Sequence, residues 1–173
     1  MDNTMMKSSA VKYPAIVMMC IIISAVLFTV CGAKLALITQ TDISSFYGRY
    51  DGVGKSFFAH VAVAVAQSVP FLMQALSLYL FSYSPLIIPA GLCVVGFRAL
   101  AAGFAYNRIC STDDATQLSV YVIITAAICV LTLFFALCRK YSYGISGVFK
   151  RTRALLVTAG TTVILEIILS YII

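Results

Sequence analysis

Five long runs of apolar residues, separated by shorter polar segments, divide this chain. They cover residues 14–38, 57–82, 86–106, 118–138 and 154–173. Each is about 20 residues or longer, which is the length that an α-helix needs to cross the hydrocarbon layer of a bilayer. The pattern predicts an all-α fold: a polytopic membrane helix bundle of about five transmembrane helices, forming a single domain over residues 1–173.

Composition agrees with this interpretation. Hydrophobic residues make up 62% of the chain and charged residues only 10%, and the mean hydropathy is +1.02. A soluble domain carries about 25% charged residues. The net charge of +6 raises the question of nucleic acid binding, but the basic residues lie between apolar runs. Basic segments at that position set the orientation of membrane helices, so we expect no nucleic acid partner.

The distribution of lysine and arginine predicts a cytoplasmic N-terminus. Seven basic residues then lie in the cytoplasm and four outside, as the positive-inside rule requires. The cytoplasmic set is Lys7, Lys12, Arg139, Lys140, Lys150, Arg151 and Arg153. The first run follows Lys7 and Lys12 as a signal peptide would, but its length favours a retained anchor, and cleavage stays open as the alternative. The chain is thus expected to be a multi-pass protein of the cell membrane.

Five of these basic residues form a predicted cytoplasmic loop, over residues 139–153. They are Arg139, Lys140, Lys150, Arg151 and Arg153. Attraction to anionic lipid, at roughly 1 kcal/mol per basic residue, explains such a loop. Docking of a cytosolic partner such as an ABC ATPase is the alternative.

Arg98 and Glu166 are the two charges that are most difficult to leave in lipid. Each lies twelve residues past the start of its apolar run, which corresponds to a depth of about 18 Å for helices entering from the same side. A lone charge at that depth is costly, so we predict an intramembrane ion pair between them. Gln67 is expected to join this polar cluster. The alternative is that these residues mark a substrate or ion pathway.

Small residues recur at helical spacing in the third run. Gly96, Ala99 and Gly103 form a stripe without bulky side chains, and Ala62 and Ala66 lie on a similar stripe of the second run. Such stripes allow helix backbones to approach closely in lipid. Packing within one bundle and a face for a homodimer or another partner both remain open.

Evidence for catalysis or metal binding is thin. The chain contains no H-E-x-x-H motif and no P-loop, and His60 is its only histidine. Most of the six cysteines fall inside apolar runs and act as small hydrophobic residues; a disulfide between Cys31 and Cys110 stays open. We therefore expect no enzyme, no cofactor and no metal site.

The third and fifth runs resemble the stage II sporulation protein M family. Residues 85–91 (PLIIPAG) and 96–104 (GFRALAAGF) are similar to the central segment of that family, in which a basic residue lies beside glycines and aromatic residues. The closing helix with a single glutamate, Ile164-Leu165-Glu166-Ile167-Ile168, is similar as well. The likeness covers residues 57–173. Where the family usually has glycine after the basic residue, this chain has Ala99.

The resemblance implies a non-enzymatic membrane scaffold. Such a protein recruits peptidoglycan-remodelling partners to the septum during engulfment in spore-forming bacteria. Relatives outside sporulation resemble membrane subunits of ABC exporters, so a transporter subunit, either a permease or a solute-binding component, is the alternative. That alternative predicts a polar cavity around Gln67, Gln74 and Arg98.

Overall fold

The chain folds into long α-helices. The computed structural model describes residues 3–38, 57–109, 115–142 and 144–172, and no strand occurs among them. The helices are α1 (Asn3–Ile38), α3 (Phe57–Phe81), α4 (Ile87–Ile109), α5 (Ala115–Tyr141) and α6 (Gly144–Ile172). This confirms the predicted all-α bundle.

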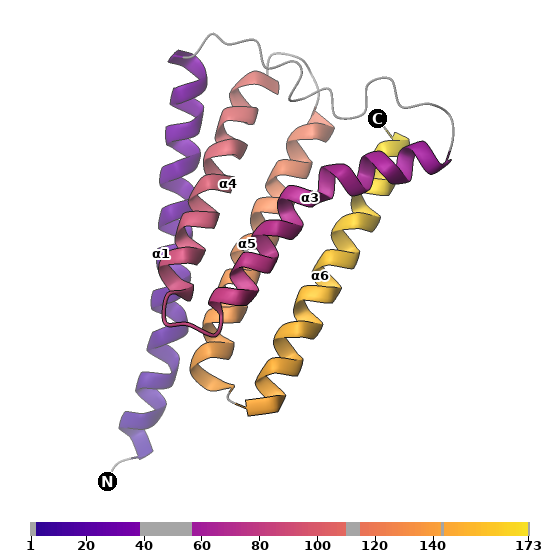
Figure 1. Cartoon of the computed structure of the whole chain (residues 1–173). Helices are drawn as coiled ribbons and strands as arrows, with labels where there is room; N and C mark the ends of the chain where they lie inside the picture. The colour runs from indigo at the N-terminus through magenta and orange to yellow at the C-terminus, as the bar shows by residue number, and fades with distance from the viewer. Residues whose placement is uncertain (1–2, 39–56, 110–114, 143, 173) are drawn as a thin grey trace.

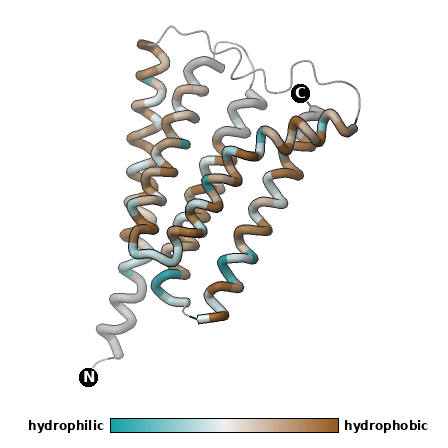
Figure 2. The backbone as a smooth tube through the Cα atoms, in the orientation of Figure 1, coloured by the Kyte–Doolittle hydropathy of each residue, from teal (hydrophilic) through white to brown (hydrophobic). Residues whose placement is uncertain are grey.

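Four of the helices contain segments long and apolar enough to cross a membrane. These segments are Lys12–Ile38, Phe57–Phe81, Ile87–Tyr106 and Val122–Tyr141. Large apolar side chains are exposed on all five helices, among them Leu27, Met73, Phe97, Val130 and Ile164. An exterior of this kind is suited to lipid rather than water. Figure 2 shows hydrophilic positions gathered near the end of α5 and the beginning of α6.

The helices alternate in direction. In Figure 1, α1, α4 and α6 run from the lower to the upper end of the bundle, whereas α3 and α5 run back. The helices that carry Arg98 and Glu166, α4 and α6, therefore run the same way, as the depth argument requires. The N-terminus lies at the lower end and the C-terminus at the upper end. α3 bends along its length in Figure 1, and Pro70 lies within it; proline removes a helical hydrogen bond and bends a helix.

Two helices begin well before their apolar runs. α1 begins at Asn3 rather than near residue 14, and α6 begins at Gly144 rather than at 154. The predicted basic loop is therefore wrong as a loop: Arg139 and Lys140 form the last turn of α5, and Lys150, Arg151 and Arg153 belong to α6. Hydropathy detects where lipid begins, whereas basic residues are good helix formers and extend the helix past that boundary.

A left-handed glycine makes the connection between α5 and α6 short. Gly144 has φ of 73°, a conformation that favours glycine because other residues clash there. Gly147 is equally constrained, because a Cβ on it would overlap the carbonyl oxygen of Ser142. The first two turns of α6 therefore press directly on the end of α5.

α1 and α4 approach each other through glycines. A Cβ added to Gly103 would overlap the carbonyl oxygen of Thr29, and one added to Gly32 would overlap that of Leu100. Gly96 lies against the Phe28 ring at 3.0 Å from the position of an added Cβ. The stripe on α4 thus packs within the chain, against α1. Ala62 and Ala66, on the similar stripe of α3, are exposed, and α4 packs chiefly on α1 and α5.

The apolar core is shared by α1, α3, α4 and α5. Its buried members include Val17, Phe71, Val95, Ile128 and Phe135, one or more from each of these helices. α6 packs mainly on α3 and only slightly on α5, and contributes the partly buried Ala154 and Leu155. α6 is therefore the helix least held by apolar packing, and its polar contacts become correspondingly important.

Candidate functional site

The first polar cluster lies in the middle of the bundle, around Arg98. This side chain is only 8% exposed, and its Nε donates a hydrogen bond to Oε1 of Gln74 on α3. A hydrogen bond to a charged group is among the stronger ones, and it partly offsets the cost of burying the guanidinium. Gln67, the residue that we expected beside Arg98, is half-buried on the same helix, seven residues before Gln74.

Glu166 is fully buried, with no exposed surface. The position of Glu166 along the bundle follows from the alignment of α3 with the antiparallel α6. This alignment is set by the hydrogen bond of 3.1 Å between Tyr79 and Thr152. Glu166 lies fourteen residues after Thr152 on α6, and Val65 lies fourteen residues before Tyr79 on α3. Glu166 is thus level with the part of α3 that carries Gln67. Arg98 bonds Gln74 of α3, and the predicted Arg98–Glu166 ion pair stays a prediction.

Other buried polar groups bond within their own helix. Four buried hydroxyl groups donate to carbonyl oxygens three or four residues earlier: those of Ser68, Ser82, Thr132 and Thr162, at 2.5–2.8 Å. Such bonds satisfy a hydroxyl group without a partner on another helix. These four residues line neither the cavity beside Thr29 nor the cavity beside Arg151. The first of these cavities, of about 310 Å³, lies between α1, α4 and α5, beside Thr29, Tyr106 and Cys129; Arg98, Gln67 and Gln74 do not line it.

The second polar cluster lies at the lower end of the bundle, around Arg151. This side chain is 6% exposed. Its Nη2 donates to the carbonyl oxygens of Cys138 at 3.0 Å and Ser142 at 3.3 Å. Cys138 belongs to the last turn of α5, and its carbonyl also accepts from the Ser142 N–H at 3.0 Å; Ser142 follows directly after the end of α5 at Tyr141. Arg151 therefore joins the beginning of α6 to the end of α5.

A chain of hydroxyl groups ties the α3–α4 turn to α6. Tyr83 donates to the Tyr79 oxygen at 3.0 Å, Tyr79 bonds Thr152, and Thr152 donates to the carbonyl oxygen of Val148 at 3.0 Å. The Tyr83 ring also lies 4.7 Å from the Arg151 guanidinium carbon, a favourable cation–π distance. The pKa of Tyr83 is raised, because its hydroxyl group donates a hydrogen bond to Tyr79 and because burial disfavours the charged phenolate.

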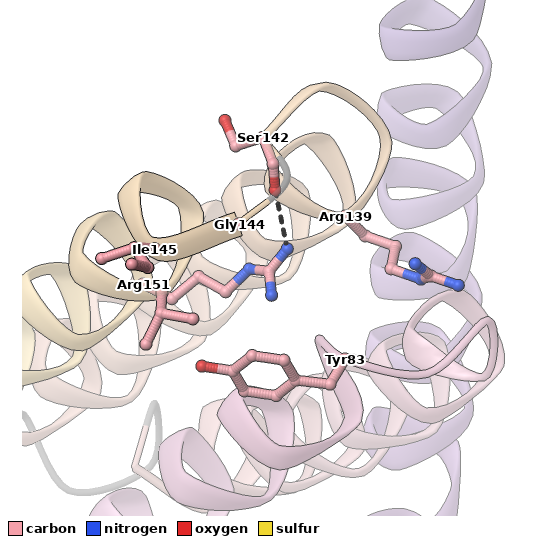
Figure 3. A pocket seen from close by; sticks show the side chains of 7 residues that line it. Tyr83, Arg139, Ser142, Gly144, Ile145 and Arg151 are labelled. Carbon is pink, nitrogen blue, oxygen red and sulfur yellow. Dashed lines mark hydrogen bonds between the residues drawn. The ribbon is translucent and has the colours of Figure 1, made fainter.

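These groups border a cavity of about 400 Å³. Tyr83, Arg139, Ser142, Gly144, Ile145, Val148 and Arg151 line it. Figure 3 shows the Arg151 guanidinium between the Ser142 carbonyl and the Tyr83 ring, with the Arg139 side chain extending from α5 away from Arg151. Arg139 and Arg151 come from the basic set that we singled out by sequence. The tyrosines and Thr152 were missed, although Tyr79 and Tyr83 are four residues apart, the spacing at which side chains meet across one helical turn.

The remaining sequence-based predictions concern the cysteines and metal binding. Cys31 is exposed, and Cys110 lies outside the described residues, so their pairing stays open. Among the described residues, no three His, Cys, Asp or Glu side chains are close enough to hold a metal ion. Comparisons of the chain with protein-family models, with curated proteins and with solved structures returned no match.

Proposed function

We propose that this chain is a non-enzymatic integral membrane scaffold with five spanning helices, a cytoplasmic N-terminus and a place in the bacterial cell membrane. By its resemblance to stage II sporulation protein M, it would recruit peptidoglycan-remodelling proteins to the septum during engulfment. The single observation that carries the scaffold is that buried polar groups of the interior are bonded within the bundle, which we call a closed interior. Four buried hydroxyl groups bond their own helices, and Gln74 accepts from Arg98.

A closed interior favours a role in positioning partners over a role in passing solutes. A translocation path needs polar side chains that face water, because their desolvation is otherwise costly. In this bundle glycine contacts bring α1 and α4 together at backbone distance, and none of Arg98, Gln67 and Gln74 lines the cavity of about 310 Å³ that these two helices share with α5. With a cytoplasmic N-terminus, the segments 39–56 and 107–117 between the apolar runs are predicted to face outward. These segments and the exposed apolar side chains of all five helices would then carry the partners.

Co-purification tests the scaffold. The tagged full chain would be extracted from native membranes in a mild detergent, and the proteins that accompany it identified by mass spectrometry. We expect a cell-wall hydrolase or another wall-remodelling protein. Arg49→Gln in the predicted outer segment should reduce its recovery at least threefold, whereas Lys150→Gln, which removes the same charge at the opposite end, should not.

Two outcomes would count against the scaffold. A chain that is recovered alone under several mild detergents has no stable partner. An ATP-binding protein that accompanies the unmodified chain, and whose recovery falls only with the Lys150→Gln variant, would favour the exporter subunit instead. The buried Arg98–Gln74 pair is the observation that keeps this second candidate open, because intramembrane ionisable residues often mark transport sites. For that candidate, a bound solute should raise the Tm of the protein in detergent.

A further inference from the structure

The cavity beside Arg151 is lined by two arginines and by no acidic side chain among the described residues. Arg151 is 94% buried, since 6% of its surface is exposed. A guanidinium carries five N–H groups, and here two backbone carbonyls accept from Nη2. Its Nε is buried and finds no hydrogen-bond acceptor within the described part of the chain. An unsatisfied buried donor on a charged group is costly, and an anion would relieve that cost.

Arg139 adds a second cation to the same cavity. It is half-buried, and among the described residues its guanidinium makes no hydrogen bond or ion pair. Turning its side chain from the position in Figure 3 toward an anion would therefore break no bond there. The described residues contain one acidic side chain, Glu166, and this lies twenty-two residues beyond the beginning of α6 at Gly144. No carboxylate in the described part of the chain balances the two arginines locally.

The backbone supplies further donors. α6 begins at Gly144, and Gly144, Ile145 and Val148 line the cavity. The first N–H groups of a helix have no helical acceptor and carry a partial positive charge, which favours anions. Two arginines beside a helix N-terminus suit the several acceptor oxygens of a phosphate group. A volume of about 400 Å³ is within the usual range for small-molecule sites.

We propose that this cavity binds a phosphate ester group, held by Arg151, Arg139 and the first turn of α6. Its place in the fold favours a phospholipid headgroup as the source. The apolar segments end at Phe81 and Tyr141 and resume at Ile87, so Tyr83, Ser142 and Gly144 lie where lipid headgroups would begin. This goes beyond diffuse attraction of basic residues to a negative surface, because it assigns one headgroup to one cavity. It is independent of which protein partner the scaffold recruits.

The test uses the full chain purified in detergent and measures three ligands separately. They are phosphatidylglycerol, the diacylglycerol with the same acyl chains but no phosphate, and inorganic phosphate. Arg139→Gln removes one cavity arginine whose side chain holds no hydrogen bond among the described residues. Arg153→Gln is the matched control, because Arg153 is exposed on the same helix as Arg151 and lies outside the cavity lining.

We expect phosphatidylglycerol to bind and diacylglycerol to bind at least tenfold more weakly. Arg139→Gln should weaken phosphatidylglycerol binding about tenfold, which corresponds to about 1.4 kcal/mol, and Arg153→Gln less than twofold. If inorganic phosphate binds with the same sensitivity to Arg139→Gln, the site recognises phosphate from solution as well. Equal losses in the two variants would overturn the proposal, since diffuse attraction would then explain the binding. Absence of binding by both phosphate ligands, with the Tm of the protein unchanged, would overturn it too.

Discussion

Arg98 and Arg151 are both buried guanidinium groups, but their surroundings differ. Arg98 lies among helices and bonds the side chain of Gln74. Arg151 lies near the beginning of α6 and bonds the backbone carbonyls of Cys138 in α5 and of Ser142 just after it. A buried charge is stable only when its donors find acceptors. Hydropathy locates both charges, but only the packing shows which acceptors each one meets.

The predicted ion pair can be tested with a double-mutant cycle on Arg98→Met and Glu166→Leu. Each single substitution should lower the free energy of unfolding by about 3–5 kcal/mol, because it leaves the other charge buried without its counterpart. The double variant should lose at least 1 kcal/mol less than the sum of the singles, since charges that interact are not additive. Steric trapping or denaturant unfolding in detergent would measure this.

A control cycle pairs Arg98→Met with Thr161→Val on the exposed face of α6. The Thr161 hydroxyl bonds carbonyls of its own helix, Val157 at 2.9 Å and Thr158 at 3.0 Å, so these two substitutions should add. If the Arg98–Glu166 cycle is equally additive, the two charges do not interact and the predicted pair is wrong.

At the scale of the element, the bundle depends on how closely α1 and α4 approach. Gly32 and Gly103 face backbone carbonyls of the partner helix, so the two glycines permit contact between backbones rather than between side chains. In lipid, where apolar burial drives helix association less than in water, such close packing is a principal source of stability. The two helices run in the same direction in Figure 1, with α3 between them in the sequence.

Alanine should destabilise the protein at Gly103 but not at Gly160. Gly103→Ala places a methyl group against the Thr29 carbonyl and should lower the free energy of unfolding by about 1–3 kcal/mol through overpacking. Gly160→Ala is the control, because nothing lies within 4 Å of its added Cβ. It should be neutral or stabilise by up to about 1 kcal/mol through helix propensity. Thermal unfolding in detergent distinguishes them, and similar losses in both would contradict the proposed α1–α4 contact.

For the whole molecule, the distribution of basic residues predicts orientation. Lys140 lies with its Nζ 3.7 Å from the centre of the Tyr13 ring, so the beginning of α1 and the end of α5 meet at one end of the bundle. Arg151 and Arg139 border one cavity at the lower end as well. Basic groups of α5 and α6 thus gather at one end of the bundle, and the positive-inside rule predicts that this end is cytoplasmic.

Cysteine labelling in intact cells tests this orientation. In a chain whose native cysteines are replaced by serine or alanine, Ser146→Cys at the exposed beginning of α6 should react with a membrane-impermeant maleimide only after permeabilisation. Asp51→Cys, in the predicted outer segment, should react without it. Labelling of Ser146→Cys but not of Asp51→Cys in intact cells would reverse the orientation. Labelling of both positions would argue against three spanning helices between them, which are α3, α4 and α5.

The sequence by itself determined the helical class, because runs of apolar residues as long as the bilayer is thick leave the backbone few alternatives. It also singled out Arg98, Glu166 and the basic residues, because charge among apolar residues is visible in one dimension. Helix pairing was decided only by the tertiary structure. Gly96 and Gly103 of α4 lie against Phe28 and Thr29 of α1 rather than against α3. Gly144 turned a predicted loop into the beginning of a helix. A small-residue stripe predicts that a close helix contact will form, but which helix makes that contact depends on the shapes of all the other helices.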